Sequence, residues 1–391
     1  MSEQTIARQS AGRQSVSWQQ FRQQMPVARH WAYYDHAAVA PLSGPSQESL
    51  EAWSRDMADN GDVHWPLWAA RLEHVRRQGA ALIGARGEEI ALVRNTTEGI
   101  GLVAEGFPWQ SGDNVVTLAD EFPSNRLPWQ NLESRGVETR LVEATGTDDD
   151  LRRIAEACDA RTRIVSVSWV DYLSGRRFDV AELASVVHRR GALLFLDAIQ
   201  GLGVFPIDVA KAEVDFLAAD GHKWLLGPEG AGLLYVRSAL LERLRPIGVG
   251  WNSVVDAARF SPNERRLKPS ASRYEGGSPN MGGFVALGAS LALLASVGTK
   301  SLAQRILKLV DQAAERLRDI GATVYLPEQP ERRSGIMTFE MPGHNPTAVR
   351  RHLQTAGVAL SCRGGRLRIS PHYYNDASDL DRLIDALRTI E

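Results

Sequence analysis

The chain has 391 residues, of which 43% are hydrophobic and 24% are charged, and its formal net charge is −2. This composition is typical of a globular protein of one or two domains, and no lysine- or arginine-rich block points to a nucleic-acid or membrane partner. The polar N-terminus lacks the apolar core of a signal peptide, and two cysteines are too few for a disulfide framework. We therefore expect a cytoplasmic protein, with a flexible tail at residues 1–15.

The hydrophobic pattern alternates between helical and strand periods from Ser46 onward. Helices are predicted at residues 18–26, 47–57, 66–83, 282–297, 300–319, 346–355 and 377–389. Strands are predicted at residues 91–93, 115–118, 138–142, 164–167, 192–196, 216–218, 232–236, 322–325, 335–340 and 366–370. Strands that alternate with helices indicate βαβ units and a mostly parallel sheet. We predict a large α/β domain over residues 46–285 and a smaller α+β domain over 286–391, against which residues 1–45 pack.

Two segments carry the clearest chemical signal. GALLFLDAIQ (191–200) is typical of a buried strand that ends at Asp197, with Gln200 just beyond it, and VDFLAADGHKWLLGPEGAG (214–232) follows a second apolar run with His222 and Lys223. Residues that follow parallel strands gather at one edge of the sheet, where ligands bind. A lysine amine that can bond an aldehyde, and a carboxylate that can keep a pyridine nitrogen protonated, suit pyridoxal 5′-phosphate. The alternatives are a helix cap or ion pair for Asp197 and a surface lysine for Lys223.

The stretch around Lys223 resembles the class V aminotransferase-fold enzymes, a group that includes cysteine desulfurases, isopenicillin N epimerase-like proteins and kynureninase. The resemblance extends from about Tyr34 to Arg388. It implies a fold-type I pyridoxal-phosphate enzyme that works as a homodimer with shared active sites. It also implies that Gln200 hydrogen-bonds the phenolate oxygen of the cofactor.

Two further segments are expected to hold the cofactor phosphate. VRNTTEGIGLVAEG (93–106) places Thr96 and Thr97 at the start of a helix, where free N–H groups and the helix dipole favour an anion. An N-cap followed by Glu98 explains the same residues equally well, and the resemblance favours phosphate binding, by Thr97 ahead of Thr96. In RYEGGSPNMGG (273–283), the resemblance implies that Ser278 reaches the phosphate of the neighbouring subunit, the alternative being a plain turn.

The residues expected around the cofactor ring depart from the family in two places. Phe122, in DEFPSNRLPW (120–129), stands where relatives stack a histidine on the ring, so it can stack but cannot transfer protons; the alternative is a core phenylalanine. Asp220 stands where relatives have Ser or Thr, and because a phosphate would repel a carboxylate we expect Asp220 to point elsewhere, for example to an arginine. His222 is expected to contact the cofactor or to pack beside Lys223. Asp171 is expected near the ring hydroxyl, with the alignment open to a shift of one residue.

The substrate side is expected to present arginines, because a guanidinium fork recognises a carboxylate best. In RGGRLRISPHYYN (363–375), Arg368 matches the carboxylate-binding arginine of the family and Arg363 is a second candidate; the alternative is a surface cluster. In YYDHAAVAP (33–41), the resemblance places Ala38, beside Ala37, in the pocket and His36 near the substrate.

The two cysteines test the desulfurase interpretation. Cysteine desulfurases carry a nucleophilic cysteine on a loop before the arginine strand, but here only residues 363–367 separate Cys362 from Arg368. Cys362 should therefore lie in or beside a strand as an inert thiol, and Cys158, in a helical pattern, should be structural.

We predict an enzyme acting at the α- or β-carbon of an amino acid, by transamination, epimerisation or β-elimination, in which Lys223 moves the α-proton. The alternative is a cysteine desulfurase or C–S lyase. A non-catalytic relative is disfavoured by the complete set of Asp197, Lys223 and Arg368. No P-loop is present, and the nine histidines do not show zinc-ligand spacing, so no metal is expected.

Overall fold

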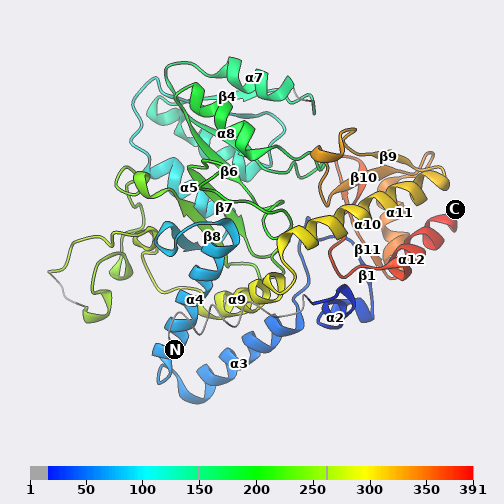
Figure 1. Cartoon of the computed structure of the whole chain (residues 1–391), viewed down its shortest axis with the longest axis horizontal. Helices are drawn as coiled ribbons and strands as arrows, with labels where there is room; N and C mark the ends of the chain where they lie inside the picture. Colours follow the sequence, from blue (N-terminus) through cyan, green and yellow to red (C-terminus); the bar gives the residue numbers. More distant parts are fainter. Residues whose placement is uncertain (1–15, 148, 261–262, 391) are drawn as a thin grey trace.

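A computed structural model describes the chain except for residues 1–15, 148, 261–262 and 391, so the expected tail lies outside the described residues. Figure 1 shows a large part that contains the main sheet and a smaller part at the C-terminal end, with the long helix α10 (Thr299–Asp319) running between them.

The large part is built around a seven-stranded sheet. Only β8 runs antiparallel to its neighbours β2 and β7, and the other neighbouring pairs are parallel, which confirms the prediction of a mostly parallel sheet. In spatial order the strands are β2 (Ile90–Val93), β8 (Gly232–Val236), β7 (Phe216–Asp220), β6 (Leu193–Asp197), β5 (Thr162–Ser168), β3 (Asn114–Leu118) and β4 (Glu138–Val142).

Helices cover both faces of this sheet. Strand side chains alternate between faces, so Leu194 and Leu196 join one core while Phe195 joins the other. The first core also contains residues of α4 (Trp65–Ile83), α7 (Asp149–Ala157), α8 (Val180–Arg189) and α9 (Met281–Ala295). The second contains residues of α5 (Thr96–Gly106) and α6 (Leu127–Gln130). The central strands are buried on both faces, which explains why they are continuous apolar runs in the sequence.

The small part is an antiparallel sheet in the order β12 (Ser361–Arg363), β13 (Arg366–Ile369), β10 (Met337–Glu340) and β9 (Thr323–Tyr325). The helices α11 (Pro346–Thr355) and α12 (Ala377–Arg388) belong to the same end of the chain. Together with α10 they bury a separate core that includes Val310, Phe339, Leu353 and Leu383.

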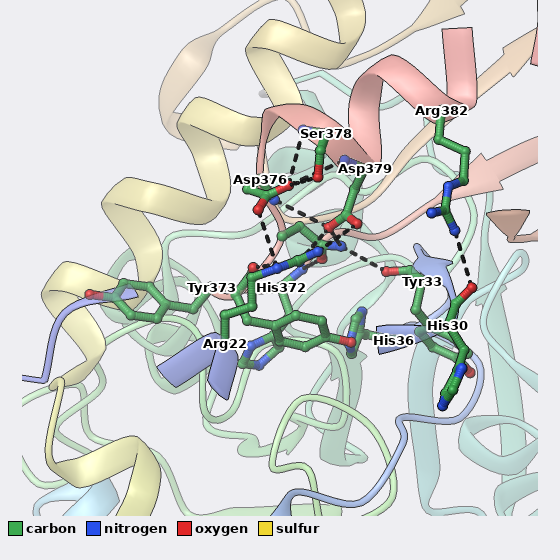
Figure 2. A network of polar contacts seen from close by, with 12 residues as sticks. Arg22, His30, Tyr33, His36, His372, Tyr373, Asp376, Ser378, Asp379 and Arg382 are labelled. Atoms are coloured by element: carbon green, nitrogen blue, oxygen red, sulfur yellow. Dashed lines mark hydrogen bonds and ion pairs between the residues drawn. The ribbon is translucent and has the colours of Figure 1, made fainter. Parts of the chain in front are cut away.

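The N-terminal segment lies against the small part. Its strand β1 (Ala32–Tyr33) pairs in parallel with β11 (Val358–Ala359). Its helix α2 (Trp18–Gln23) carries Arg22, whose guanidinium donates two hydrogen bonds to Asp379, of 2.7 and 3.0 Å. Figure 2 shows this network, in which Arg22 lies between Asp376 and Asp379 at the start of α12.

The expected domain boundary at residues 285/286 falls inside α9. Val285 and Leu287, on either side of it, join the same core of the large part, and α9 packs against α3 (Gly44–Asn60) and α4. Along α10, Ile306 joins that core while Val310 joins the core of the small part. We therefore infer that the boundary lies within α10.

Most predicted elements are present with ends shifted by a few residues. Among the predicted helices, the largest shift of the ends is at α3, which extends beyond the predicted 47–57 because Ser43 caps its start and Gly61 ends it. Strands β1, β11 and β12 were not predicted, since two or three residues carry no periodic signal, and the helices α6 and α8 were not predicted either. Among the described residues, no single helix is long and apolar enough to cross a membrane; α9 and α10 combine sufficient length with an apolar composition only as a pair, and that pair is bent by 81°.

Candidate active site

Asp197 and Lys223 meet at the carboxyl edge of the large sheet. β6 ends at Asp197, the parallel neighbour β7 ends at Asp220, and the following turn carries Lys223. A cavity of about 240 Å³ opens at this edge. Its wall combines residues of the N-terminal segment, the large part and the small part: Ala37, Ala38, Val39, Asn95, Thr96, Thr97, Phe122, Ser124, Ser168, Val170, Tyr172, Asp197, Ile199, Gln200, Asp220, His222, Lys223, Arg363 and Arg368.

Burial favours the neutral forms of Asp197 and Lys223. Asp197 is 3% exposed, and burial raises its pKa to about 6, although the Ile199 N–H and the charge of Lys223 act in the opposite direction. Burial lowers the pKa of Lys223 to about 8, against the attraction of Asp197. A lysine that titrates near neutrality can act as a base or as a nucleophile, which an exposed lysine cannot do as well. Lys223 is therefore not a surface lysine.

Phe122 offers a flat apolar surface beside these groups. Its side chain is 45% exposed, which argues against a core phenylalanine, and the Lys223 Nζ lies 5.7 Å from the ring centroid. The ring of Tyr172 meets it edge-on, with centroids 5.4 Å apart. A planar aromatic ring that reaches both Lys223 and Asp197 can stack here, so the wall fits the ring of pyridoxal 5′-phosphate.

The N-terminus of α5 faces the same cavity. Its N-cap is Asn95, whose side chain accepts a hydrogen bond from the Glu98 N–H at 2.8 Å, so neither threonine is the cap. Thr96 Oγ1 accepts from the Asp220 N–H at 3.0 Å, and Thr97 Oγ1 donates to Ser124 Oγ at 2.8 Å. A helix N-terminus with hydroxyls around it fits a phosphate.

Sequence reasoning missed two wall residues at this end, Asn95 and Ser124. An asparagine three residues before a glutamate at a helix start is a capping-box signal, which could have identified Asn95. Ser124 has no such signal, because its position depends on the loop that follows β3.

Asp220 stays on the cavity wall rather than pointing away. Its Oδ2 lies 2.8 Å from His222 Nδ1, and its Oδ1 accepts from the Gly221 N–H at 2.6 Å. The expected arginine partner is therefore wrong, and the partner is His222. With the Gly221 N–H and the His222 ring beside it, the buried carboxylate of Asp220 is not left without polar partners.

Arg368, on β13, also lines the cavity and is 2% exposed. Its Nε donates to Ser361 Oγ at 3.2 Å and its Nη1 to the Tyr172 carbonyl at 2.7 Å, while its Nη2 lies 3.5 Å from Asp35 Oδ1. A guanidinium this buried is not part of a surface cluster. Arg363 lies on the same wall but is exposed.

Two expected contacts are placed elsewhere. Asp171 is absent from the cavity wall, because its carboxylate accepts hydrogen bonds from Leu173 N, Ser174 N and Ser174 Oγ and closes a turn; Tyr172, one residue on, lines the cavity. His36 is fully buried behind the wall, where its ring nitrogens contact the Ser370 carbonyl at 2.8 Å and the Tyr374 hydroxyl at 2.9 Å. This geometry speaks against a direct substrate contact by His36.

Of the two remaining predicted cofactor contacts, Gln200 lines the Lys223 cavity and Ser278 does not. Gln200 lines the cavity, but its amide accepts from Trp224 Nε1 at 2.8 Å and donates to the Ala37 carbonyl at 3.0 Å. Ser278 is exposed in a separate hollow, whose wall shares Asn95 and Thr97 with the Lys223 cavity. Within the described part of one chain, Ser278 therefore does not line the cavity of Lys223.

A buried carboxyl group behind the wall was not predicted. Glu121 accepts hydrogen bonds from the Ser168 N–H at 2.6 Å and from the Ser168 hydroxyl. Burial raises the pKa of Glu121 to about 8, and the charge of Asp197 acts in the same direction. Glu121 is therefore mostly protonated at neutral pH, whereas Asp197, with a pKa of about 6, is mostly ionised.

Both cysteines are free thiols, and of the described residues that line the cavity none is a cysteine. Cys362 pairs with Leu367 between β12 and β13, whereas Ser361 pairs with Arg368. Neighbouring residues of a strand point to opposite faces, so Cys362 faces the side of buried Leu367, away from Arg368. The expectation that Cys362 lies in a strand is confirmed. Cys158 is buried just after α7, where its Sγ donates to the Ile154 carbonyl.

Comparisons with known proteins agree with this geometry. Residues 32–383 match the aminotransferase class V family. A probable cysteine desulfurase of Methanothermobacter thermautotrophicus is 32% identical over an alignment that covers 94% of this chain and 97% of that protein. The apo structure of a cysteine desulfurase from Thermococcus onnurineus aligns with a TM-score of 0.86 at 27% identity, covering 94% of this chain and 96% of that chain.

A complex of the cystine C–S lyase C-DES aligns with a TM-score of 0.88 at 22% identity, covering 94% of this chain and 100% of that chain, which supports the fold alone. Three observations point to the same family: the mixed sheet, the lysine and aspartate at its carboxyl edge, and the family match over most of the chain. The chain belongs to the class V aminotransferase family and is a pyridoxal-phosphate-dependent enzyme of fold type I.

Proposed function

We propose that this enzyme breaks the C–S bond of a sulfur-containing amino acid by β-elimination and releases the sulfur as a small molecule, without passing it to a cysteine of its own. The cysteine desulfurase relatives support a sulfur-containing substrate. The observation that carries the elimination is the position of Cys362, which faces away from the cavity while Lys223 and Arg368 both line it. A thiol on the far face of a strand cannot attack a sulfur atom held inside the cavity.

The residues present would hold the cofactor as follows. Lys223 would bond its aldehyde, Asp197 would pair with the ring nitrogen, and Phe122 would stack on the ring. Thr97, Thr96, His222 and the N-terminus of α5 would bind the phosphate, and Gln200 would face the ring oxygen. When bound, the cofactor supplies an electron sink for charge that develops at the α-carbon.

The protein's own groups then perform the proton chemistry. The buried guanidinium of Arg368 binds the substrate carboxylate, and this contact orients the α-hydrogen toward Lys223. With a pKa of about 8, the Lys223 amine is neutral often enough at neutral pH to remove that proton. The C–S bond electrons leave with sulfur as a thiolate. Phe122 cannot supply a proton, so the leaving thiolate takes its proton from Lys223 or from water.

Product analysis tests this function. With cysteine, elimination followed by reaction with one water yields sulfide, pyruvate and ammonia. A desulfurase would instead yield alanine, and a transaminase would yield a keto acid that keeps the sulfur. We expect pyruvate and ammonia in a one-to-one ratio from cysteine or an S-substituted cysteine, and Cys362→Ser should leave that ratio unchanged. Alanine as the main product, lost in Cys362→Ser, would contradict the proposal.

We also propose that two chains assemble into a homodimer in which Ser278 completes the partner's phosphate site. The hollow that contains Ser278 adjoins the Lys223 cavity at Asn95 and Thr97. Large apolar side chains remain exposed on α3, on α4, in the turn between these helices and in the segment after β8: Met57, Val63, Trp65, Leu67, Ile247, Val249 and Trp251. Apolar groups that gather on a surface commonly mark a protein interface.

The test of the dimer uses sedimentation together with cofactor affinity. Ile247→Asp should shift the protein toward monomer, and Ser278→Ala should weaken cofactor binding while the dimer persists. A monomeric wild-type protein with full cofactor affinity would contradict the proposal.

A further inference from the structure

Tyr172, in the turn after β5, lines the cavity but has no role in the proposed chemistry. The neighbouring residue Asp171 holds this turn in place. Asp171 closes this turn with its carboxylate, at 2.5 Å from both the N and the Oγ of Ser174, and its own N–H donates to the Arg176 carbonyl at 2.8 Å. Gly175 has a φ of +72°, and a Cβ there would lie 2.3 Å from the Ile336 carbonyl oxygen, so the turn requires glycine at this position. Tyr172 is therefore held in a defined place on the cavity wall.

Tyr172 contacts both functional sides of the cavity. Its carbonyl accepts a hydrogen bond from Arg368 Nη1 at 2.7 Å, and its ring meets the ring of Phe122 at an interplanar angle of 75°. Phe122 in turn lies under the Lys223 amine, 5.7 Å from its ring centroid. One residue thus joins the guanidinium that would bind the substrate carboxylate to the aromatic wall beside the reacting carbon.

We propose that Tyr172 is a substrate-positioning and specificity-determining residue of this site. Its ring, with Phe122, forms a subsite for an uncharged sulfur-bearing side chain, a thioether or a disulfide, and its carbonyl sets the position of Arg368. The inference rests on the proposed function for the identity of the substrate atom. Polarisable sulfur contacts aromatic ring edges favourably, and Ala38, Val39 and Val170 complete an apolar surround. Asp171 acts through Tyr172 by holding the turn.

The test compares amino acids that bind but carry no β-leaving group, so it does not depend on C–S cleavage. Methionine and its sulfur-free isostere norleucine are titrated into the cofactor-loaded enzyme, and their dissociation constants are measured from the cofactor absorbance. In the wild type we expect methionine to bind about two- to tenfold more tightly than norleucine. Tyr172→Ala should weaken the binding of methionine more than that of norleucine. The ratio of the two dissociation constants should then be close to one.

Three further variants separate the ring from the main-chain carbonyl. Tyr172→Phe keeps both the aromatic ring and the carbonyl, so both dissociation constants should stay within about twofold of the wild-type values. Tyr172→Leu keeps apolar bulk without an aromatic face, so it should lose the methionine preference even if Tyr172→Ala folds poorly. Asp171→Ala should weaken both ligands equally, because it loosens the carbonyl that positions Arg368. Leu141→Ala, at an exposed position on the edge strand β4, serves as the surface control.

Each outcome decides the inference. A methionine preference that survives in both Tyr172→Ala and Tyr172→Leu overturns the specificity role. Asp171→Ala that binds both ligands as the wild type does overturns the positioning role. If the preference follows the ring but the product analysis yields no pyruvate, the subsite stands and the proposed elimination fails.

Discussion

Two polar regions of this protein differ in how their buried charged groups are paired. At the junction between the N-terminal segment and the small part, Arg22 contacts Asp379 through two hydrogen bonds and lies 3.2 Å from Asp376. Asn375 bridges Asp379 to the Tyr33 carbonyl, and Asp376 caps α12. Figure 2 shows that this network joins segments from the two ends of the chain. Here each buried charge has a close partner.

At the carboxyl edge of the large sheet, the contacts of the buried ionisable groups do not fully offset the cost of burying their charges. Burial raises the pKa of Asp197 to about 6 and that of Glu121 to about 8, and it lowers the pKa of Lys223 to about 8. Paired charges hold the fold together, whereas groups that titrate near neutrality can exchange protons. The comparison therefore predicts that changes at the junction alter stability and that changes at the sheet edge alter chemistry.

The largest expected effect is the loss of chemistry at Lys223. Lys223→Ala should abolish the visible absorbance of lysine-bound cofactor and reduce turnover by more than about 10³-fold, because both the covalent attachment and the base are lost. Absorbance spectra and single-turnover rates measure this. Lys211→Ala removes an exposed lysine paired with Asp208 and should change neither. Retention of the absorbance in Lys223→Ala would refute the assignment of the site.

The next effect belongs to the junction. Arg22→Ala leaves Asp379, which is 4% exposed, without its guanidinium partner, and should lower the free energy of unfolding by about 2–3 kcal/mol. Urea denaturation measures this difference. Arg94→Ala, which breaks the exposed pair with Glu98, is the matched control and should cost less than about 0.5 kcal/mol. An equal loss of unfolding free energy in the two variants would contradict the stabilising role of the charge network at the junction.

A smaller, pH-dependent effect is expected at Glu121. Its pKa is raised on folding, so its stabilising contribution is complete below pH 4.5 and is lost as the pH rises through about 8. Glu121→Gln mimics the protonated group and removes this dependence. Between pH 6 and pH 8 the variant should therefore gain roughly 2 kcal/mol relative to the wild type in urea titrations. Parallel stability curves would show that Glu121 is ionised in the folded protein.

The smallest effect is expected at Cys362. Cys362→Ser should leave the rate of pyruvate formation within about twofold of wild type, since the thiol faces away from the cavity and the hydroxyl is of similar size. Coupled assays of pyruvate release measure the rate. A loss of activity that follows the thiol alone would assign to Cys362 the nucleophilic role that its position argues against.

The sequence by itself determined the elements and groups that depend on neighbours along the chain. Buried parallel strands are continuous apolar runs, so β6 and β7 and the residues that follow them, Asp197 and Lys223, could be identified without a structure. The switch from strand to helical period likewise identified α5 and its start beside Thr96 and Thr97. These features follow from local periodicity and from the shared edge of parallel strands.

Only the tertiary structure decided which side chains face the cavity. Tyr172 rather than Asp171 lines it, because Asp171 bonds within its own turn, and Cys362 is turned away by its register against Leu367. The partner of Asp220 proved to be His222, and His36 lies behind the wall against Tyr374. A shift of one residue reverses the face of a strand or turn, and composition does not encode that shift; it is set by packing and hydrogen bonding between segments that are far apart in the chain.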